Sequence, residues 1–502
     1  MKASKDINGG SEDMNYKIIG DDLLGNILLA SDGKMKKEAL SQPVVDFFKS
    51  LLTKVVKGDR GFIFEKTDIE VVPAGMILEM DQISTKENIA LGKQMVGRTV
   101  ILKLNGGLGT GMGLDRAKSL LEINEGVNYL DAIVAQVTKM REESGQEVPL
   151  LFMDSFGTTT DTLGFLNKNY PDLAVKGLPL DMVQNKFPKI NQDGKMPAAH
   201  PTEALNWNPP GHGDVYTVLH STGMLENLLA AGIKYALISN SDNLGATYSN
   251  RIVGFMEKNN VPFIMETAKR IKSDVKGGHL AKKAGEDKLA LRELANCPAD
   301  EEDSFIDIDK WTDFNTNNIW LNLESLKKIL IENDGVMPLD LIVNSKVNNP
   351  QAGEDSDNPA DTKKVYQLET AMGSAISYFD GAKAVRVDTT KRFFPTKKSS
   401  DLLLLRSDAL ILNLEDGSIT LNSRQTKPVV LLDDNYKTTQ DLKAMCPEGY
   451  PSLKDCDNLE IKGPVIFGEN VVIKGNVKIV NKSENPLKID SNTVLENVVI
   501  SQ

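Results

Sequence analysis

Five glycines lie within the eight residues 106–113, directly after the apolar run Thr99–Leu104. Such a run is typical of a buried strand, and glycines let backbone N–H groups approach a charged ligand because no Cβ intervenes. Lys118 follows at the expected start of the next helix and adds a positive charge. The segment therefore predicts a polyphosphate site built from loop N–H groups and one cation. The alternative is a glycine-rich turn without a ligand.

This glycine-rich loop fits neither common phosphate-binding motif. A P-loop requires lysine directly after its second glycine, but Gly111 is followed by Met112. A dinucleotide fingerprint needs glycines at positions i, i+2 and i+5, and the windows that begin at Gly107, Gly109 and Gly111 lack the third. The loop indicates a phosphate site of another kind.

A second polar segment, Ser239–Gly245, ends the apolar run Tyr235–Ser239. Asp242 stands where the carboxyl end of a strand would place it, and a carboxylate there can hold Mg²⁺ beside phosphates. The alternative is an Asx-turn before a helix. Together with the neighbouring polyphosphate site, the metal interpretation is favoured.

Three further parts of the sequence offer neutral hydrogen-bonding groups. His212 lies between two glycines in Pro209–Asp214, so we expect it to be exposed and able to donate to a phosphate, although a loop histidine is usually plain surface. The segment Phe314–Trp320 crowds amides at the end of an expected strand, which suits a sugar, with a turn as the alternative. The amide of Gln184 can meet a uracil edge with one donor and one acceptor.

The basic segment Lys391–Lys398 stands at the expected junction with the last domain. In an acidic chain, such a segment can close over an anion. A solvated linker is the usual alternative for a charge run. No G-x-S-x-G motif and no cysteine beside a histidine point to covalent catalysis.

Strand-like and helical patterns alternate through the middle of the chain. Strands are expected at Val100–Leu104, Pro149–Met153, Tyr235–Ser239 and Pro262–Ala268; helices are expected at Lys36–Val56, Asn128–Arg141, Thr159–Asn169, Val215–Ala231, Asn250–Asn259 and Gln367–Phe379, and a surface loop at Asn344–Thr362. The alternation predicts an α/β fold with a central, mostly parallel sheet flanked by helices. Ligands bind at the carboxyl ends of strands in such sheets, where the glycine-rich loop begins.

The last part of the chain has a different pattern. In Leu459–Val480, short alternating apolar runs are separated by glycines about every six residues. This pattern predicts a small parallel β-helix, with an antiparallel meander as the alternative. Because a β-helix ends in open strand edges, we expect any self-association to use this domain.

Length and composition limit the number of domains, the kinds of partner and the cellular compartment. The 502 residues allow two or three domains, and 58 Lys+Arg against 70 Asp+Glu give a net charge of −12, which argues against nucleic acid and anionic membranes as partners. Three scattered cysteines suit a reducing compartment. No signal peptide or membrane span is visible, and Met1–Asn15 reads as disordered. We expect a cytoplasmic location.

The motifs occur together in a known family. The chain resembles the UDP-glucose pyrophosphorylases of the eukaryotic type (UTP–glucose-1-phosphate uridylyltransferases), and the form of residues 109–114 is most similar to the protozoan branch. The matching segments, which span about residues 98–408, are Lys103–Thr110 with Lys118, Gln184–Asn185 with Pro188–Lys189, Pro210–Asp214, Asn240 with Asp242–Gly245, Gly277–Leu280, Phe314–Asn318, Tyr366–Gly373, Arg392–Phe393 and Lys397–Leu403.

The resemblance implies a catalytic nucleotidyltransferase domain at residues 61–395, an N-terminal helical segment at 1–60 and a C-terminal left-handed β-helix at 396–502. It implies Mg²⁺-dependent uridylyl transfer from UTP to glucose 1-phosphate, giving UDP-glucose and pyrophosphate. The implied nucleotide contacts are Leu104, Asn105, Gly106, Gly107, Gln184, His212, Gly213 and Asp242. Asp242 is also the implied metal ligand, and the implied catalytic lysines are Lys118 and Lys397. The implied sugar-binding residues are Asn240, Glu266, Gly278, Asn315 and Asn317.

The sequence departs from the family pattern at two places. Ser241 stands where the family usually has glycine or an aliphatic residue, and Asp115–Ala117 replaces a more widespread Gly-Pro before the lysine. Neither change removes a charged group. Two alternatives stay open: a pyrophosphorylase that accepts other sugar 1-phosphates, and a UDP-sugar-binding scaffold without catalysis.

Overall fold

The computed structural model describes residues 21–271, 277–353 and 356–502, so the expected disorder of Met1–Asn15 lies outside the described residues. The chain forms two compact units. One contains residues 187–208 and 341–368 together with the N-terminal residues up to Gly61, and the other contains residues 62–186, 209–340 and 369–502. The domain boundaries expected after residues 60 and 395 stay a prediction. No helix in the described ranges is long and apolar enough to cross a bilayer.

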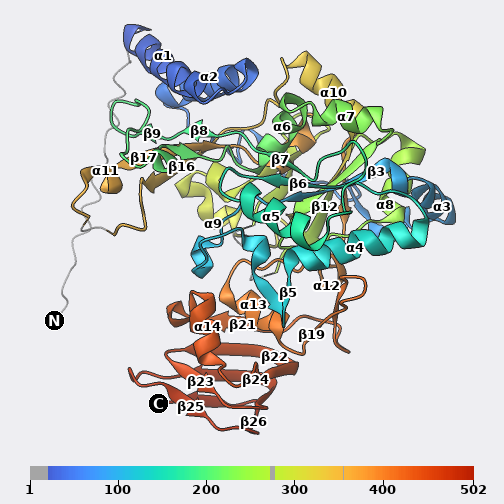
Figure 1. Cartoon of the computed structure of the whole chain (residues 1–502), viewed down its shortest axis with the longest axis vertical. Helices are drawn as coiled ribbons and strands as arrows, with labels where there is room; N and C mark the ends of the chain where they lie inside the picture. The colour runs from blue at the N-terminus through green and yellow to red at the C-terminus, as the bar shows by residue number, and fades with distance from the viewer. Residues whose placement is uncertain (1–20, 272–276, 354–355) are drawn as a thin grey trace. The chain divides into compact units, whose positions relative to one another are not determined.

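A large sheet forms the centre of the second unit (Figure 1). Its main path runs in the order β2 (Ile77–Glu79), β18 (Lys383–Arg386), β12 (Phe263–Lys269), β15 (Asp313–Asn322), β11 (Tyr235–Asn240), β3 (Thr99–Leu104), β6 (Leu150–Asp154) and β7 (Asp181–Val183), while β1 (Ile69–Glu70), β13 (His279–Lys283) and β14 (Leu289–Arg292) pair beside it. Along this path only β15 runs antiparallel to its neighbours. The expected mostly parallel sheet is therefore confirmed.

The register of two central strands brings the two strongest sequence signals together. Strand β3 is buried along its whole length, and it pairs in parallel with β11 so that Leu104 lies opposite Asn240. The glycine-rich loop and the Asp242 loop consequently leave the sheet side by side, at the carboxyl edge where α/β sheets bind ligands.

Helices cover both faces of this sheet, as expected (Figure 1). One core cluster joins Ile101 of β3 to α4 (Tyr129–Ser144), α5 (Thr159–Asn169) and α8 (Asn250–Asn259), against which α3 (Lys86–Gln94) packs. The other joins Leu102 to α6 (Val215–Ser221), α7 (Met224–Ala230) and α10 (Leu323–Glu332). Successive strand residues thus face opposite cores. The helix expected at 215–231 is interrupted at Gly223, whose φ is 74°.

Two expected helix positions are wrong. Lys118 begins a 3₁₀ turn, η4 (Lys118–Leu120), and the next α-helix starts only at Tyr129. Residues 367–379 form the end of β17 (Lys364–Glu369) and a 3₁₀ segment, η9 (Met372–Ser377). Strand β17 pairs with β9 (Ile190–Asn191) through Val365 and Tyr366 and continues to Glu369, so tertiary pairing overrides the helical spacing at the start of this segment. In η9 a Cβ on Gly373 would lie 2.5 Å from Leu291 Cδ2, which shows how tightly this turn packs.

Short elements complete the second unit. They are η1 (Met80–Ile83), η2 (Val96–Arg98), η3 (Thr110–Met112), β4 (Glu122–Asn124), β5 (Val127–Asn128), η6 (His212–Asp214), η7 (Leu294–Asn296), η8 (Ala299–Glu301), α9 (Glu302–Phe305), α12 (Thr389–Arg392), α13 (Ser399–Arg406), β19 (Leu410–Leu412), β20 (Ile419–Leu421), η10 (Asp434–Tyr436) and α14 (Thr439–Met445).

The first unit packs around an amphipathic helix. Its elements are α1 (Asp21–Lys37), α2 (Gln42–Val56), β8 (Phe187–Pro188), β9, η5 (Glu203–Asn206), β10 (Trp207–Asn208), β16 (Ile342–Val347), α11 (Pro359–Thr362) and β17. Helix α2 buries Val45, Phe48 and Leu52 against Phe187 and Leu368. The expected helix at 36–56 is confirmed from Gln42 onward, and the expected loop at 344–362 includes the end of β16 and helix α11.

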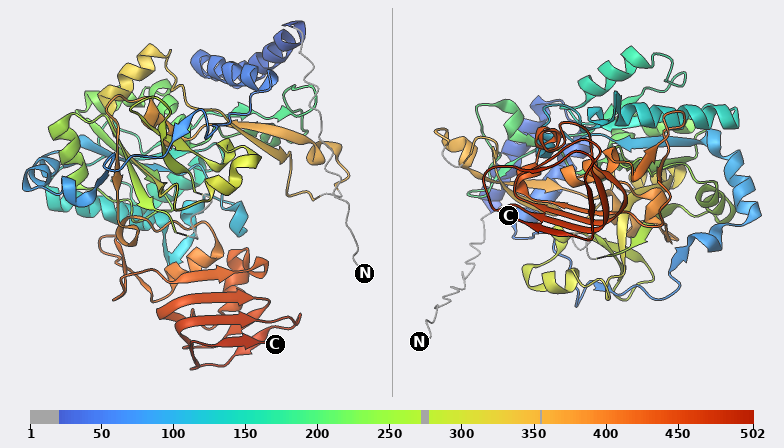
Figure 2. Two further views of the ribbon diagram at one scale, coloured as in Figure 1. Left: turned by 180° about the vertical axis from the view of Figure 1, so that it is seen from behind. Right: turned by 90° about the horizontal axis from the view of Figure 1, so that it is seen from below.

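The C-terminal strands pair in parallel. They are β21 (Val429–Leu432), β22 (Ser452–Lys462), β23 (Val465–Phe467), β24 (Val472–Val480), β25 (Leu487–Ile489), β26 (Val494–Glu496) and β27 (Val499–Ser501), and Figure 2 shows them lying side by side. Leu459 lies opposite Val477, and Val465 lies opposite Leu487. Because all these pairs are parallel, the antiparallel meander is excluded.

Candidate active site

The glycine-rich loop has one closed and one open face. A Cβ on Gly106 would lie 2.5 Å from Nε2 of Gln184, so these two expected nucleotide contacts are neighbours and glycine is needed there. A Cβ on Gly107 would meet no protein atom within 4 Å. Gly107 thus borders open space in which a ligand can approach the backbone.

Asn105 anchors the loop from within. Its side chain is buried: Nδ2 donates to Oδ1 of Asp154 at 2.8 Å, and Oδ1 accepts from the hydroxyl of Ser241 at 3.0 Å. Burial raises the pKa of Asp154 to about 6. The side chain of Asn105 therefore holds the two loops together and faces the protein.

Lys118 and Asp242 meet between the two loops. Nζ of Lys118 lies 2.6 Å from Oδ2 of Asp242 and also donates to the main-chain oxygen of Thr396. The other carboxylate oxygen of Asp242, Oδ1, is buried without a hydrogen-bond partner among the described residues. An unsatisfied carboxylate oxygen is costly unless a ligand completes it.

The chemistry of this carboxylate fits Mg²⁺. Within the described ranges no three acidic, histidine or cysteine side chains gather as a complete metal site. Mg²⁺, however, is commonly held by one or two carboxylates together with substrate phosphates and water. Asp242 is the residue that would hold it.

Lys397 lies near the same centre. Its side chain is exposed, and its backbone N–H donates to Asp401 at the start of α13. The ammonium acts electrostatically on His212 and on Glu293. The structure thus brings both expected lysines to one region, although they are far apart in the sequence.

His212 is half-buried, which corrects its expected exposure. Its Nδ1 accepts a hydrogen bond from the backbone N–H of Met372 at 2.9 Å. Burial, assisted by the charge of Lys397, lowers its pKa to about 4, so the ring is neutral at pH 7. Because Nδ1 is an acceptor, the neutral ring carries its proton on Nε2 and can donate there.

The turn that carries His212 is tied to the Gln184 segment. Asn185 donates from its backbone and its side chain to Asp214, at 2.7 and 2.9 Å. A Cβ on Gly213 would lie 2.5 Å from Oγ1 of Thr370, so the turn closes tightly only with glycine. Gln184, His212 and Gly213 therefore belong to one wall.

The amide cluster lies in the first half of β15, whereas the sequence suggested the end of a strand. Nδ2 of Asn315 donates to Oδ1 of Asn317 at 2.8 Å, and the backbone N–H of Asn315 donates to the carbonyl of Gly278 at 3.0 Å. Asn317 has a φ of 59°. Asn315, Asn317 and Gly278 therefore form one surface.

Glu293 is a residue that the sequence analysis missed. Its carboxylate lies within 2.5 Å of the position that a Cβ on Gly278 would occupy. Burial raises its pKa, and the charge of Lys397 opposes this rise. No local motif marks Glu293; it lies near Gly278 because β13 and β14 pair, with His279 opposite Arg292.

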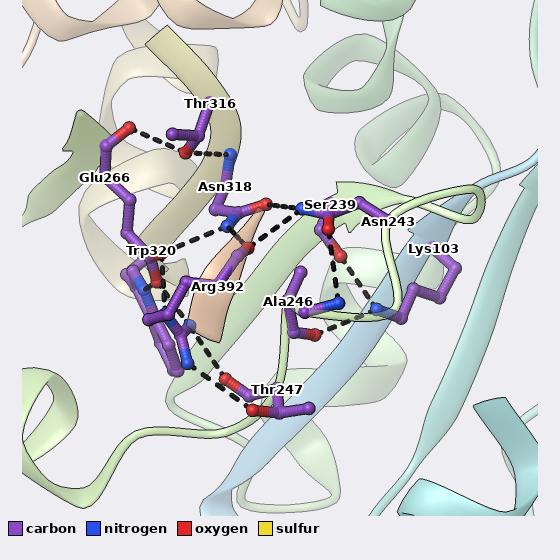
Figure 3. A network of polar contacts seen from close by, with 11 residues as sticks. Lys103, Ser239, Asn243, Ala246, Thr247, Glu266, Thr316, Asn318, Trp320 and Arg392 are labelled. Atoms are coloured by element: carbon purple, nitrogen blue, oxygen red, sulfur yellow. Dashed lines mark hydrogen bonds and ion pairs between the residues drawn. The ribbon is translucent and has the colours of Figure 1, made fainter. Parts of the chain in front are cut away.

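Of the expected sugar-binding residues, Asn240 lies at the edge of the sheet, whereas Glu266 is buried inside the protein. Asn240 ends β11 at the edge shared with Leu104. Glu266 is fully buried, and its carboxylate accepts hydrogen bonds from Trp320 Nε1 at 2.8 Å, Asn318 Nδ2 at 3.0 Å and Arg392 Nε at 2.8 Å (Figure 3). The Glu266 carboxylate is thus fully engaged inside the protein.

Comparisons with known sequences and with solved structures point to the same family of proteins. A family model described as UTP–glucose-1-phosphate uridylyltransferase matches residues 45–474. A UTP–glucose-1-phosphate uridylyltransferase 2 of Dictyostelium discoideum is 35% identical over 480 residues, which cover 94% of this chain and 90% of that protein. The Saccharomyces cerevisiae enzyme of the same name is 37% identical over 412 residues, 81% of this chain and 78% of that protein.

Solved structures are similar over nearly the whole chain. UDP-glucose phosphorylase from Trypanosoma brucei is 42% identical with a TM-score of 0.86, covering 95% of this chain and 100% of that chain. UDP-glucose pyrophosphorylase from Leishmania major is 38% identical with a TM-score of 0.85, covering 95% and 99%. These proteins come from protozoa, in keeping with the branch suggested by residues 109–114.

Proposed function

This chain belongs to the UTP–glucose-1-phosphate uridylyltransferase family, a family of nucleotidyltransferases, and from this we propose that it converts UTP and glucose 1-phosphate into UDP-glucose and pyrophosphate. The observation that carries the proposal is the convergence of Lys118, Asp242 and Lys397 beside a loop whose Gly107 borders open space. Two cations and one carboxylate with a free oxygen suit a reaction between two phosphorylated substrates.

The uridine would lie along the wall that contains Gly106 and Gln184. A glutamine amide offers one donor and one acceptor, which matches the edge of uracil. The backbone of Leu104, Gly106 and Gly107 would border the nucleoside, since Gly107 faces open space. Gly213 would contact the base from the neighbouring turn. Asn105 would support these contacts from behind.

The phosphates would be bound by Lys118, Lys397 and His212. Lys118 would exchange its present partners, Asp242 and Thr396, for phosphate oxygens. His212 would donate from Nε2 without adding charge, since its pKa is about 4. The two lysines would neutralise charge that spreads over the transition state.

Mg²⁺ would be held by Asp242. When bound, the ion supplies charge neutralisation at the phosphates and helps to orient them. The unpartnered Oδ1 of Asp242 and its place beside Lys118 support this assignment.

The transfer would proceed by direct in-line attack. A glucose 1-phosphate oxygen is already anionic, so no general base is needed, and it attacks the α-phosphorus of UTP while pyrophosphate leaves. The bond formed and the bond broken are both phosphorus–oxygen bonds, without a covalent enzyme intermediate. The protein contributes by positioning two anions and stabilising their charge.

The sugar would face Asn240 and the surface formed by Gly278, Asn315 and Asn317. Amides hydrogen-bond hydroxyl groups without charge. Glu293 adds a carboxylate acceptor next to Gly278, so it would also contact a hydroxyl. Glu266 would support this wall from within the protein.

For the C-terminal strands we propose a left-handed β-helix whose last strands mediate any self-association. Val494 and Val499 are 55% and 70% exposed there. The three cysteines are unpaired and buried, which suits a reducing, cytoplasmic location.

A sugar panel tests the proposed function. UDP-sugar formation would be measured with glucose 1-phosphate, galactose 1-phosphate and N-acetylglucosamine 1-phosphate, each with UTP and Mg²⁺. Turnover with glucose 1-phosphate alone is expected. Comparable turnover with all three would indicate a broad-range enzyme, and binding of UDP-glucose by folded protein without any turnover would indicate a scaffold.

A further inference from the structure

We propose that Asn243 and Arg392 are positioning residues that hold the Lys397 segment, residues 392–397, against the Asp242 loop, residues 240–248. The inference rests on the proposed function, because it assigns these residues a role in placing Lys397 relative to Asp242. Neither side chain needs to touch a substrate for this role. Both belong to the buried polar network in Figure 3.

Asn243 directly follows Asp242, and both the oxygen and the nitrogen of its side-chain amide form hydrogen bonds with the Lys397 segment. Its oxygen accepts from the backbone N–H of Phe394 at 2.8 Å, and its nitrogen donates to the main-chain oxygen of Arg392 at 3.2 Å. Asn243 is 1% exposed and also forms a backbone bridge with Pro395. The residue beside the expected metal ligand thus fixes the chain two to five residues before Lys397.

Arg392 makes the reciprocal contact. Its Nη2 donates to the main-chain oxygen of Thr247 at 2.9 Å, within the Asp242 loop. The same guanidinium forms two hydrogen bonds with the buried carboxylate of Glu266, at 2.8 and 2.5 Å. Arg392 therefore joins the Lys397 segment, the Asp242 loop and strand β12.

Close packing leaves little freedom between the two segments. A Cβ on Gly245 would lie 2.5 Å from the carbonyl carbon of Arg392. From the other side, buried Lys103 donates to the main-chain oxygen of Ala246 at 3.0 Å and to Ser239 Oγ at 2.9 Å (Figure 3). The side chains of Lys103 and Arg392 thus donate to the carbonyls of the consecutive residues Ala246 and Thr247 in this loop.

Energetics favour a positioning role over a stabilising one. A buried ion pair such as Glu266–Arg392 contributes little net stability, because desolvation offsets the attraction. A planar guanidinium nevertheless fixes the geometry of every group it binds. Since a misplacement of about 1 Å can cost about 100-fold in rate, a rigid link between Lys397 and Asp242 would matter for turnover.

A double-mutant cycle tests the inference. Asn243→Ala would be made in the parent and in a Lys397→Ala background, with Asn88→Ala as the control. Asn88 is 3% exposed and donates to Ile83 from helix α3, so its loss removes a buried amide that does not contact the Lys397 segment. We expect Asn243→Ala to lower kcat about 10- to 100-fold in the parent and less than about twofold without Lys397.

Three outcomes of the cycle are informative. An equal loss of kcat in both backgrounds would overturn the inference, because Asn243 would then act independently of Lys397. An equal loss in Asn88→Ala would also overturn it, since a general loss of packing would explain the effect. Normal turnover of Lys397→Ala alone would instead contradict the role of Lys397 in the proposed function.

Hydrogen exchange supplies a readout that needs no activity. The Phe394 amide is expected to exchange at least about tenfold faster in Asn243→Ala, and unchanged in Asn88→Ala, because its acceptor has been removed. Unchanged exchange would overturn the inference. If Asn243→Ala does not fold, Arg392→Lys keeps the charge on Glu266 balanced while it loses the two-pronged geometry. This variant should fold, lower kcat and raise Phe394 exchange; parent-like values of both would overturn the inference.

Discussion

The ammonium of Lys118 lies 2.6 Å from Oδ2 of Asp242, so a lysine of the glycine-rich segment neutralises the carboxylate that follows strand β11. The same ammonium binds the main-chain oxygen of Thr396, next to Lys397. One side chain therefore connects the three segments from which the proposed active site is built. When substrates are bound, Lys118 is proposed to bind phosphate oxygens and Asp242 is proposed to hold Mg²⁺.

Replacing Lys118 should damage turnover far more than folding. For Lys118→Ala we expect kcat to fall about 100- to 1,000-fold, because a cation that stabilises the transition state is lost. Steady-state kinetics and the melting temperature would be compared with Lys168→Ala, which removes an exposed lysine of helix α5. Equal kcat values for the two variants would remove Lys118 from the mechanism.

Asp242→Asn should change the response to Mg²⁺. The substitution keeps the shape of the side chain but removes its negative charge, so we expect about 100-fold lower kcat and a higher Mg²⁺ concentration for half-maximal rate. Titrating the metal at fixed substrate concentrations measures both quantities. An unchanged Mg²⁺ titration would show that another group holds the ion.

Gly107→Ala should weaken ligand binding without lowering the stability of the ligand-free protein. A Cβ at Gly107 meets no protein atom within 4 Å, so the melting temperature of the ligand-free variant should match that of the parent. If the nucleotide approaches this backbone, the affinity for UDP-glucose, measured by calorimetry, should fall about tenfold or more. The matched control is Gly111→Ala in η3, whose Cβ would also meet nothing within 4 Å. Parent-like affinity of Gly107→Ala would place the nucleotide elsewhere.

His212 should make the protein less stable as the pH falls. Its pKa is about 4 in the folded state, below the ordinary 6.5, so its contribution is present above pH 6.5 and is lost between pH 6.5 and 4. This difference corresponds to at most about 3 kcal/mol. The melting temperature of the parent should therefore fall more steeply over this range than that of His212→Gln. Parallel curves would show that His212 is not held neutral by the fold.

Much of the fold follows from local sequence patterns. The apolar runs that precede Gly106 and Asp242 are buried strands, and their positions agree with the structure to within one or two residues. These patterns could not show that β15 inserts antiparallel between β11 and β12, because strand pairing depends on contacts between distant residues. The same limitation explains the wrong helix at 367–379, where the end of strand β17 and the 3₁₀ segment η9 stand instead.

Sequence analysis could predict those residues of the candidate site that lie in or next to a recognisable sequence motif. Lys118 and Asp242 stand in or next to glycine- and amide-rich segments, and the structure brings them together. Gln184 stands in no such segment, and its closeness to Gly106 appears only in the structure. Glu293 stands in no such segment and is recognised only through its contact with Gly278. The exposure of His212 was mistaken because its ring contacts Met372, which is far away in the sequence.

The most direct test is the initial rate of pyrophosphate release from UTP and glucose 1-phosphate, measured with Mg²⁺ and then with EDTA. The account predicts rapid release that requires both substrates and stops in EDTA, with UDP-glucose formed in equal amount. Release that does not depend on glucose 1-phosphate would indicate hydrolysis of UTP. Either that result, or no release by folded protein that binds UDP-glucose, would contradict the proposed uridylyl transfer.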